Sequence, residues 1–313
     1  MVIRGVTTAF PSLCIENGTI ADWCQSDTNF LAEKVGIVSR YFLNVEEDEL
    51  DLACAASSRL FTMFPNLAED IRLVIYVGQA KKTIIPHASA LLQHRLGLSS
   101  QCAAFDIGLA CSGYVYALAI AEGFMATHRI HNALLVTCDP YSLIMGRTNR
   151  DTVPLFGDAA SATLLSTSGT GLHVGKYDLG TDGSKASFLE YERTSELTMN
   201  GRGIFNFAMQ YVPLSVQRCL EANGVTKDAV DYFFLHQANK FILEALCGKL
   251  GITQEKCPVC VAETANTVSS SIPLVIEKYF AKLRHGQSVV MSGFGGGLSW
   301  ATTCATFLEE NHD

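Results

Sequence analysis

One helix constrains the fold of this chain more than any other feature of its sequence. Residues 112–128 are predicted to form a helix that is apolar on nearly all sides through its first three turns. Such a helix is buried rather than half-exposed. A buried helix that lies between sheets needs several layers, so the sequence predicts a multi-layer architecture.

Short β-branched runs alternate with longer helical patterns along the rest of the chain, which is typical of an α/β fold with layered sheets. The loosest stretch, 166–171 (STSGTG), lies near the midpoint. We interpret it as the seam between two similar halves, 1–168 and 169–313, although no strong internal repeat is visible. The predicted strands are 3–7, 73–77, 103–106, 133–137, 160–165, 171–179, 232–235, 288–292 and 302–307. The predicted helices are 18–24, 50–64, 86–96, 112–128, 205–223, 239–250 and 273–283.

Composition excludes several classes of protein. The chain has 313 residues, of which 48% are hydrophobic and 17% charged, so it can bury a large core. Its net charge is −8 (23 Lys and Arg against 31 Asp and Glu), which argues against a nucleic-acid partner. The longest apolar stretch, 113–126, is too short to cross a membrane, and no signal peptide is visible.

The eleven cysteines are scattered without a framework spacing, as in a reducing compartment, so we expect a cytoplasmic protein. One CxxC pair, Cys257 and Cys260, has no further ligands nearby, and two ordinary thiols explain it better than zinc does.

Cys111 stands out among these cysteines because of its position. The sequence AFDIGLACSGYVYAL places it after a predicted strand and directly before the buried helix. A thiol at a helix N-terminus has a lowered pKa, and the thiolate is a nucleophile. Small neighbours such as Gly108 and Gly113 allow a sharp turn and close approach of a substrate.

Two further polar residues are candidates for the same site. The sequence FFLHQAN places His236 at the tip of a buried strand, where it suits an acid, a base or a donor, although a structural histidine is about equally expected. Asn266, in ETANTVSSSIP, is predicted to lie in a loop before a helix that Pro273 opens, and its amide could donate a hydrogen bond into a pocket. Asn is also common in ordinary loops, so a structural role is equally consistent with this position.

A glycine cluster, GFGGG at 293–297, follows a late β run. Leu298 occupies the third glycine position of a dinucleotide fingerprint, and the stretch from Gly169 fails in the same way, so nucleotide-cofactor binding is disfavoured. Bare backbone N–H groups in such a cluster can instead stabilise an oxyanion.

In combination, LACSG, LHQAN, ANTVSSSIP and GFGGGLSW resemble the β-ketoacyl-acyl carrier protein synthase III family, a condensing-enzyme branch of the thiolase-fold superfamily. The resemblance extends over essentially the whole chain. It implies a duplicated five-layer αβαβα sandwich, and a decarboxylative Claisen condensation of an acyl-CoA with a malonyl thioester. Both thioesters are then substrates, with no cofactor and no metal, and the expected assembly is a homodimer. The malonyl group would arrive on acyl carrier protein or on CoA, in fatty-acid initiation or a specialised pathway.

The resemblance also implies roles for individual residues. Cys111, His236 and Asn266 would form the catalytic triad, with backbone N–H groups of Cys111 and Gly296 as the oxyanion hole. The CoA and pantetheine contacts would be Phe30, Arg150, Gly201, Phe205, Ala238 and Asn239, and the acyl pocket would include Ile85 and Phe156.

This chain departs from the family pattern at three places, two of them among these residues. Phe30 stands where Trp is usual, Ile85 where Phe is frequent, and Phe241 where an Arg often contacts the carrier protein. Ile85 favours a primer longer or more branched than acetyl, and together the departures favour a specialised pathway. The remaining variation, GDAAS at 157–161, is interpreted as packing.

Three other functions compete with condensation. Cys111 could transfer its acyl group to a hydroxyl or amine without decarboxylation, but the Asn of the triad is often replaced in that class, and Asn266 is present. A catalytically degenerate partner in a heterodimer usually lacks the Cys or the His of the triad, whereas Cys111 and His236 are both present in this chain. A papain-type Cys–His–Asn hydrolase is the third alternative, but the HQAN and GFGGG motifs would have no role in such an enzyme.

Overall fold

The computed structural model describes residues 1–192 and 195–310. Nine of its strands form one continuous hydrogen-bonded order, β11-β12-β13-β8-β1-β7-β6-β4-β5, and β2–β3 and β9–β10 form two small antiparallel pairs. The strands are β1 (Val2–Ala9), β2 (Leu13–Glu16), β3 (Ser39–Phe42), β4 (Ile71–Val77), β5 (Ala103–Ile107), β6 (Asn132–Cys138), β7 (Ala160–Ser166), β8 (Gly171–Thr181), β9 (Leu189–Glu190), β10 (Thr198–Met199), β11 (Tyr232–Leu235), β12 (Ser288–Gly295) and β13 (Ser299–Leu308).

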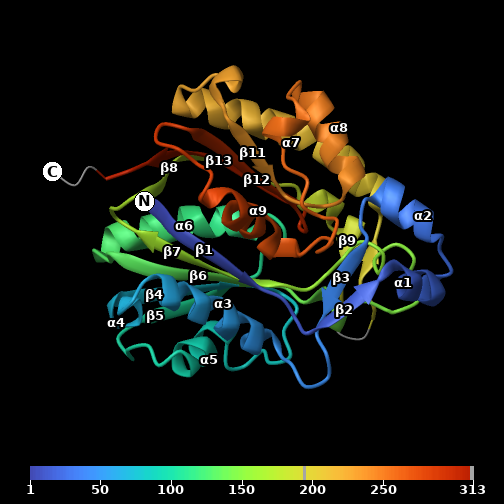
Figure 1. Ribbon diagram of the computed structural model, residues 1–313, viewed down its shortest axis with the longest axis horizontal. Coiled ribbons are helices and arrows are strands. Elements are labelled where there is room, and N and C mark those ends of the chain that lie inside the picture. The colour runs from blue at the N-terminus through green and yellow to red at the C-terminus, as the bar shows by residue number, and fades with distance from the viewer. Residues whose placement is uncertain (193–194, 311–313) are drawn as a thin grey trace.

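The helices and sheets form five layers (Figure 1). The strands from β5 to β1 make one sheet layer and those from β8 to β11 the other, with α6 and α9 between them. Helices α3 to α5 cover the outside of the first sheet layer, and α7 and α8 cover the second. The helices are α1 (Asn17–Cys24), α2 (Thr28–Phe30), α3 (Glu49–Met63), α4 (Leu67–Asp70), α5 (Ala88–Arg95), α6 (Gly113–His128), α7 (Gly201–Asn223), α8 (Lys240–Leu250) and α9 (Ser271–Phe280). The predicted αβαβα sandwich is therefore confirmed.

Strand pairing in the first half of the chain repeats in the second. Strand β4 pairs parallel with β6, and β6–β7 and β7–β1 are antiparallel. In the same sense, β11 pairs parallel with β12, and β12–β13 and β13–β8 are antiparallel. The halves meet where Val2 and Ile3 of β1 pair with β8. This repetition supports a duplicated unit, and the division at residue 168 stays a prediction.

Three apolar clusters fill the spaces between the five layers, and the central one contains α6 and α9. Helix α6 is buried over most of its first turns, as its sequence predicts. A side-chain carbon added at Gly113 would lie 2.5 Å from Val77 of β4, so the start of this helix packs directly on the sheet. This packing fixes the position of Cys111, two residues before it.

The observed helix boundaries differ from the predicted ones where capping chemistry was not recognised. Helix α7 begins at Gly201 rather than 205, because the Asn200 side chain accepts the Gly203 N–H and caps it. Helix α9 begins at Ser271, so Pro273 is not its first residue as predicted. The antiparallel β2–β3 pair was missed because its strands are short and β2 is mostly exposed, with no apolar run to reveal it.

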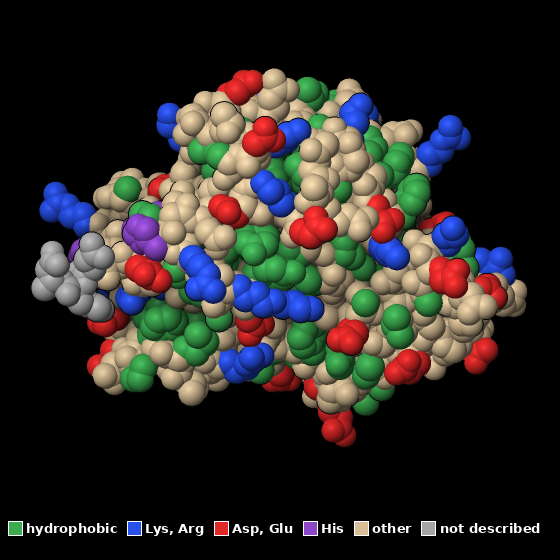
Figure 2. Space-filling model, turned by 45° about the horizontal axis from the view of Figure 1, so that its top comes forward, with side chains coloured by type: hydrophobic (Ala, Val, Ile, Leu, Met, Phe, Trp, Pro, Cys, Tyr) green, Lys and Arg blue, Asp and Glu red, His purple; other side chains and the backbone are tan. Residues whose placement is uncertain are grey.

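None of the described helices combines the length and apolar character that a membrane crossing requires. On the face shown in Figure 2, basic and acidic side chains are interspersed around hydrophobic ones.

Candidate active site

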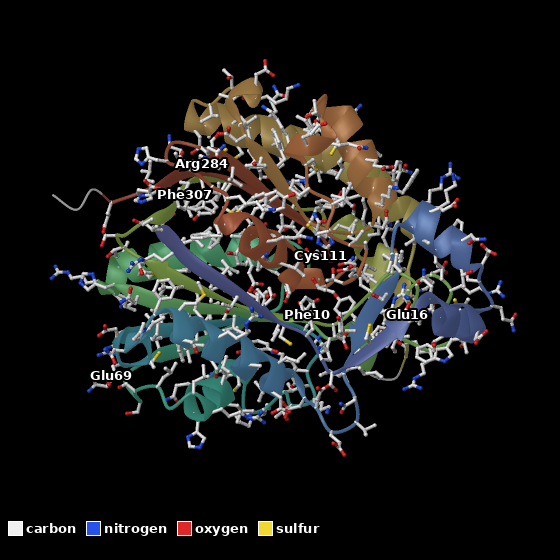
Figure 3. All side chains as sticks on the ribbon, in the orientation of Figure 1. Phe10, Glu16, Glu69, Cys111, Arg284 and Phe307 are labelled. Atoms are coloured by element: carbon white, nitrogen blue, oxygen red, sulfur yellow. The ribbon has the colours of Figure 1, made fainter. Side chains whose placement is uncertain are left out.

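A small cavity of about 80 Å³ lies between the two halves of the fold and brings together the three residues of the predicted triad. Figure 3 shows Cys111 near the middle of the molecule, between the two sheet layers. Segments from both halves of the chain contribute to the wall. The lining residues are Cys111, Leu155, Phe156, Leu189, Met199, Gly201, Ile204, His236, Ala238, Asn239, Ile242, Asn266, Phe294 and Gly295.

Cys111 is only 4% exposed and is packed against the end of β12. A side-chain carbon added at Gly293 would lie 2.6 Å from the Cys111 carbonyl oxygen, and one added at Gly295 would lie 3.1 Å from its Sγ. Only glycine fits at these two positions without displacing the cysteine. The glycine-rich segment therefore lies directly against the candidate nucleophile.

The charge state of Cys111 differs from the sequence-based expectation. Burial raises the pKa of the thiol well above its usual range, and the nearby Asp139 raises it further. The prediction that the helix N-terminus lowers the pKa of Cys111 is therefore wrong for this closed cavity, because desolvation of the thiolate outweighs the effect of the helix. Cys111 rests as a neutral thiol.

His236 follows directly after β11, and its backbone N–H donates to the Ser292 carbonyl at 2.8 Å. Its ring packs edge-on against Phe294, with 5.3 Å between the ring centroids. Ring nitrogen Nδ1 lies 2.7 Å from Ser271 Oγ. Burial lowers the pKa of His236 to about 3, so the imidazole is neutral at pH 7.

Asn266 is held on both sides of its backbone. Its N–H donates to the Leu155 carbonyl at 2.9 Å, and its carbonyl accepts from Gly157 N–H at 3.0 Å. Its side-chain oxygen accepts the Val268 N–H at 2.9 Å. This last bond orients the amide, so that its NH₂ group points away from Val268 and remains available to the cavity.

The residues that flank Asn266 have unusual backbone conformations. Ala265 has φ +57° and Val268 has φ +53°, in the left-handed region that β-branched residues rarely adopt. Such conformations cluster at functional sites and persist only where the surrounding structure enforces them.

Gly296, the second predicted oxyanion donor, lies beside the residue that precedes Cys111. A carbon added at Gly296 would be 3.3 Å from Cβ of Ala110. Its carbonyl accepts from Ser299 Oγ at 2.7 Å, and Ser299 Oγ lies 2.7 Å from Ser112 Oγ. This hydroxyl pair links the nucleophile loop to the glycine segment, and sequence reasoning missed it because 187 residues separate its members.

The predicted CoA contacts divide into two groups. Gly201, Ala238 and Asn239 line the cavity, whereas Phe30 and Arg150 are exposed residues outside its wall. The Arg150 guanidinium donates to Gln25 Oε1 at 3.0 Å.

Phe205 and Phe241 form a stacked aromatic pair, with ring centroids 5.3 Å apart. Their chain neighbours Ile204 and Ile242 line the cavity. The pair therefore lies beside the cavity, and Phe241 is 59% exposed.

The two predicted acyl-pocket residues occupy different places. Phe156 is buried, lines the cavity and packs against Tyr141, with ring centroids 5.0 Å apart. Ile85 is 89% exposed and is not part of the wall of its own cavity. Sequence reasoning missed the rest of the apolar cluster around Cys111 and Phe156, which consists of Ala80, Ala110, Tyr141, Leu197 and Val268.

Comparisons with known proteins give a consistent result. Residues 105–183 match the family model described as 3-Oxoacyl-[acyl-carrier-protein (ACP)] synthase III, and residues 220–307 match its C-terminal model. Beta-ketoacyl-[acyl-carrier-protein] synthase III of Staphylococcus aureus is 33% identical over 301 residues, which are 95% of this chain and 96% of that protein.

Solved structures of similar proteins share the fold. A crystal structure of a 3-oxoacyl-(acyl-carrier-protein) synthase III superposes with a TM-score of 0.92 at 32% identity and covers 98% of this chain and 99% of that one. The priming β-ketosynthase of the R1128 polyketide biosynthetic pathway superposes with a TM-score of 0.90 at 26% identity, over 99% of this chain and 96% of that one.

Proposed function

Because the chain belongs to the 3-oxoacyl-[acyl-carrier-protein] synthase III family, which consists of condensing enzymes, we propose that Cys111, His236 and Asn266 carry out its condensation. The reaction joins an acyl-CoA primer to a malonyl thioester with loss of CO₂. The observation that supports these roles is that all three side chains line one cavity.

The first step is acylation of Cys111. Its Sγ adds to the thioester carbonyl of the acyl-CoA to form a tetrahedral oxyanion, which collapses as the carbon–sulfur bond to CoA breaks. The thiol proton leaves with the CoA sulfur, so the step is neutral overall. Backbone N–H groups of Cys111 and Gly296 stabilise the oxyanion, and one such donor is typically worth about 10²–10³ in rate.

The second step forms the carbon nucleophile. The malonyl thioester loses CO₂, and the electron pair of the broken carbon–carbon bond becomes an enolate. His236 and the Asn266 amide donate to the thioester oxygen on which this charge develops. The enolate carbon then attacks the acyl group on Cys111, releases the β-ketoacyl thioester, and the departing thiolate takes up a proton. Decarboxylation supplies the carbanion, so no resident cofactor is required.

We further propose that the protein acts as a homodimer. Ile84 and Ile85 are 53% and 89% exposed on one loop, and within the described part of the chain β5 is an edge strand that pairs with β4 alone. Exposed apolar side chains and an open strand edge are both features that a partner subunit covers. Sedimentation at several concentrations distinguishes a dimer from a monomer, and Ile85→Asp is expected to weaken the dimer.

The pathway and place of action are part of the proposal. The eleven cysteines are all free thiols, which supports a reducing compartment such as the cytoplasm. Ile85 favours a primer longer or more branched than acetyl, and the departures at Phe30, Ile85 and Phe241 together favour a specialised pathway.

A panel of acyl-CoAs, read by intact mass, tests the proposal. The wild-type protein and a Cys14→Ser control, which removes the exposed thiol, should gain one acyl group, and Cys111→Ala should gain none. CO₂ release from malonyl-CoA and from malonyl-carrier protein is measured alongside. Ester or amide products formed without CO₂ would instead indicate acyl transfer to a hydroxyl or amine.

A further inference from the structure

Ser271, the first residue of α9, places its hydroxyl group against the His236 ring. Its Oγ lies 2.7 Å from Nδ1, and the backbone N–H of Gln237 donates to the same oxygen at 3.4 Å. Ser271 is 1% exposed and His236 is 2% exposed. The hydroxyl is therefore shielded from bulk water and has to find its hydrogen-bond partners within the protein.

The neutral His236 ring has one proton, which resides on either Nδ1 or Nε2. If Nδ1 carried it, Nδ1 and the Gln237 N–H would both donate to Ser271 Oγ, and the hydroxyl proton would have no acceptor among the described residues. If Nε2 carries it, the hydroxyl donates to Nδ1 and accepts from Gln237, so the hydroxyl and Nδ1 are both paired, and the protonated Nε2 is left for the cavity that His236 lines. A buried unpaired donor is costly, so the second arrangement is favoured.

We propose that Ser271 is a positioning residue that holds His236 in the tautomer with the proton on Nε2. This inference rests on the proposed function and deepens it. Nδ1 is bonded to Ser271, and the ring lines the cavity together with Cys111 and Asn266. The protonated Nε2 then presents a donor to a bound thioester.

The tautomer assigns His236 to one half of the reaction. An unprotonated Nε2 would act as a base toward the Cys111 thiol, whereas Nε2–H donates to the malonyl thioester oxygen as CO₂ leaves. Ser271 therefore supports decarboxylation and leaves acylation of Cys111 largely independent of it.

Ser271→Ala tests this assignment, because it removes the hydroxyl with little change in volume. We expect decarboxylation of malonyl-CoA to fall by about tenfold, in line with one lost hydrogen bond, while acylation of Cys111 changes less than about twofold. Ser271→Thr keeps a hydroxyl and should restore most of the decarboxylation rate. Ser270→Ala is the matched control, because Ser270 is equally buried but bonds Thr137 and the Ala159 carbonyl instead.

¹⁵N NMR of the histidine rings provides a second readout. The His236 signals, assigned by their loss in His236→Gln, should show Nε2 protonated in the wild type and in Ser270→Ala, and a mixed population in Ser271→Ala. An unchanged tautomer in Ser271→Ala, or a parallel fall of acylation and decarboxylation, would overturn the proposal. If the wild type releases no CO₂ from malonyl thioesters, the proposed function fails, and the NMR comparison still decides the role of Ser271.

Discussion

Gly295 lies so close to Cys111 that a methyl group on its Cα would be 2.9 Å from Cβ and 3.1 Å from Sγ of the cysteine. Its φ of +156° adds a second reason for glycine at this position. We therefore expect Gly295→Ala to displace the thiol and slow acyl-adduct formation by about 10²-fold, which intact mass after a timed exposure to acyl-CoA measures. Gly123→Ala in α6, where nothing lies within 4 Å, should acylate normally and be about 0.5–1 kcal/mol more stable.

Asn266→Asp tests the direction of the hydrogen bonds in the cavity. The Val268 N–H holds Oδ1, so the group available to the substrate is the donating NH₂. Aspartate offers only acceptors there when ionised, and its charge repels the enolate. Decarboxylation should fall by about 10²–10³-fold while acylation of Cys111 persists. Acylation that falls in step with decarboxylation would show that Asn266 does not act in the second half-reaction alone.

Burial of His236 makes the free energy of unfolding depend on pH. The pKa of His236 is lowered to about 3 in the folded protein, so between pH 6.5 and 3 the unfolded chain binds a proton that the folded one does not. This contribution to stability is complete above pH 6.5 and is lost as the pH falls toward 3, by up to a few kcal/mol. Urea unfolding at several pH values should show a weaker loss on acidification in His236→Asn than in the wild type.

The pKa shift of Asp158 makes stability depend on pH in the opposite direction, so the comparison between wild type and His236→Asn is necessary. Burial raises the pKa of Asp158 to about 6, so the folded protein binds the extra proton between pH 3.8 and 6. Its contribution to stability therefore falls as the pH rises through that window. Only the difference between wild type and His236→Asn isolates the histidine, and equal pH dependence in both would contradict the predicted effect.

The sequence predicted a multi-layer fold and the three triad candidates because their signals are local, whereas the five-layer sandwich and the roles of the triad followed from the family resemblance. Helix 112–128 is apolar on nearly all sides through its first three turns, and Cys111, His236 and Asn266 each occupy a junction between a strand or loop and a helix. The contacts that set their chemistry join distant parts of the chain: Ser271 to His236, Ser112 to Ser299. No spacing rule reports such contacts.

The pKa of Cys111 was mispredicted for a related reason. A helix N-terminus is visible in the sequence, but the extent of burial around a thiol depends on the packing of several segments. The predicted CoA contacts show the same limit, since Gly201 and Ala238 line the cavity whereas Arg150 extends to Gln25 at the surface.

Phe241→Arg tests whether this aromatic residue limits docking of an acidic carrier protein. The ring is 59% exposed and stacks on Phe205, beside Lys240. A guanidinium there should lower KM for a malonyl-carrier protein several-fold at low salt and leave KM for malonyl-CoA nearly unchanged. Phe241→Ala is the control, because it removes the ring without adding charge. An equal change in both variants would assign the effect to loss of the ring.

Arg40 is predicted to position Asn266 through the segment between them. The guanidinium is fully buried and donates to Asn17 Oδ1 and to the Pro154 carbonyl, each at 2.9 Å, and burial lowers its pKa to about 10. Residues 155 and 157 of that segment hold the Asn266 backbone on both sides.

Arg40→Met combines two opposing effects on folding. It leaves the two acceptors unpaired, at about 1–3 kcal/mol each, and also relieves the desolvation of a buried cation. We therefore expect a change in unfolding free energy within about 3 kcal/mol and a retained fold. Decarboxylation should fall by about 10²-fold as Asn266 shifts, while acylation of Cys111 is largely kept. Arg59→Met, which removes a mostly exposed guanidinium, should leave both half-reactions unchanged. Decarboxylation at the wild-type rate in folded Arg40→Met would refute the positioning role.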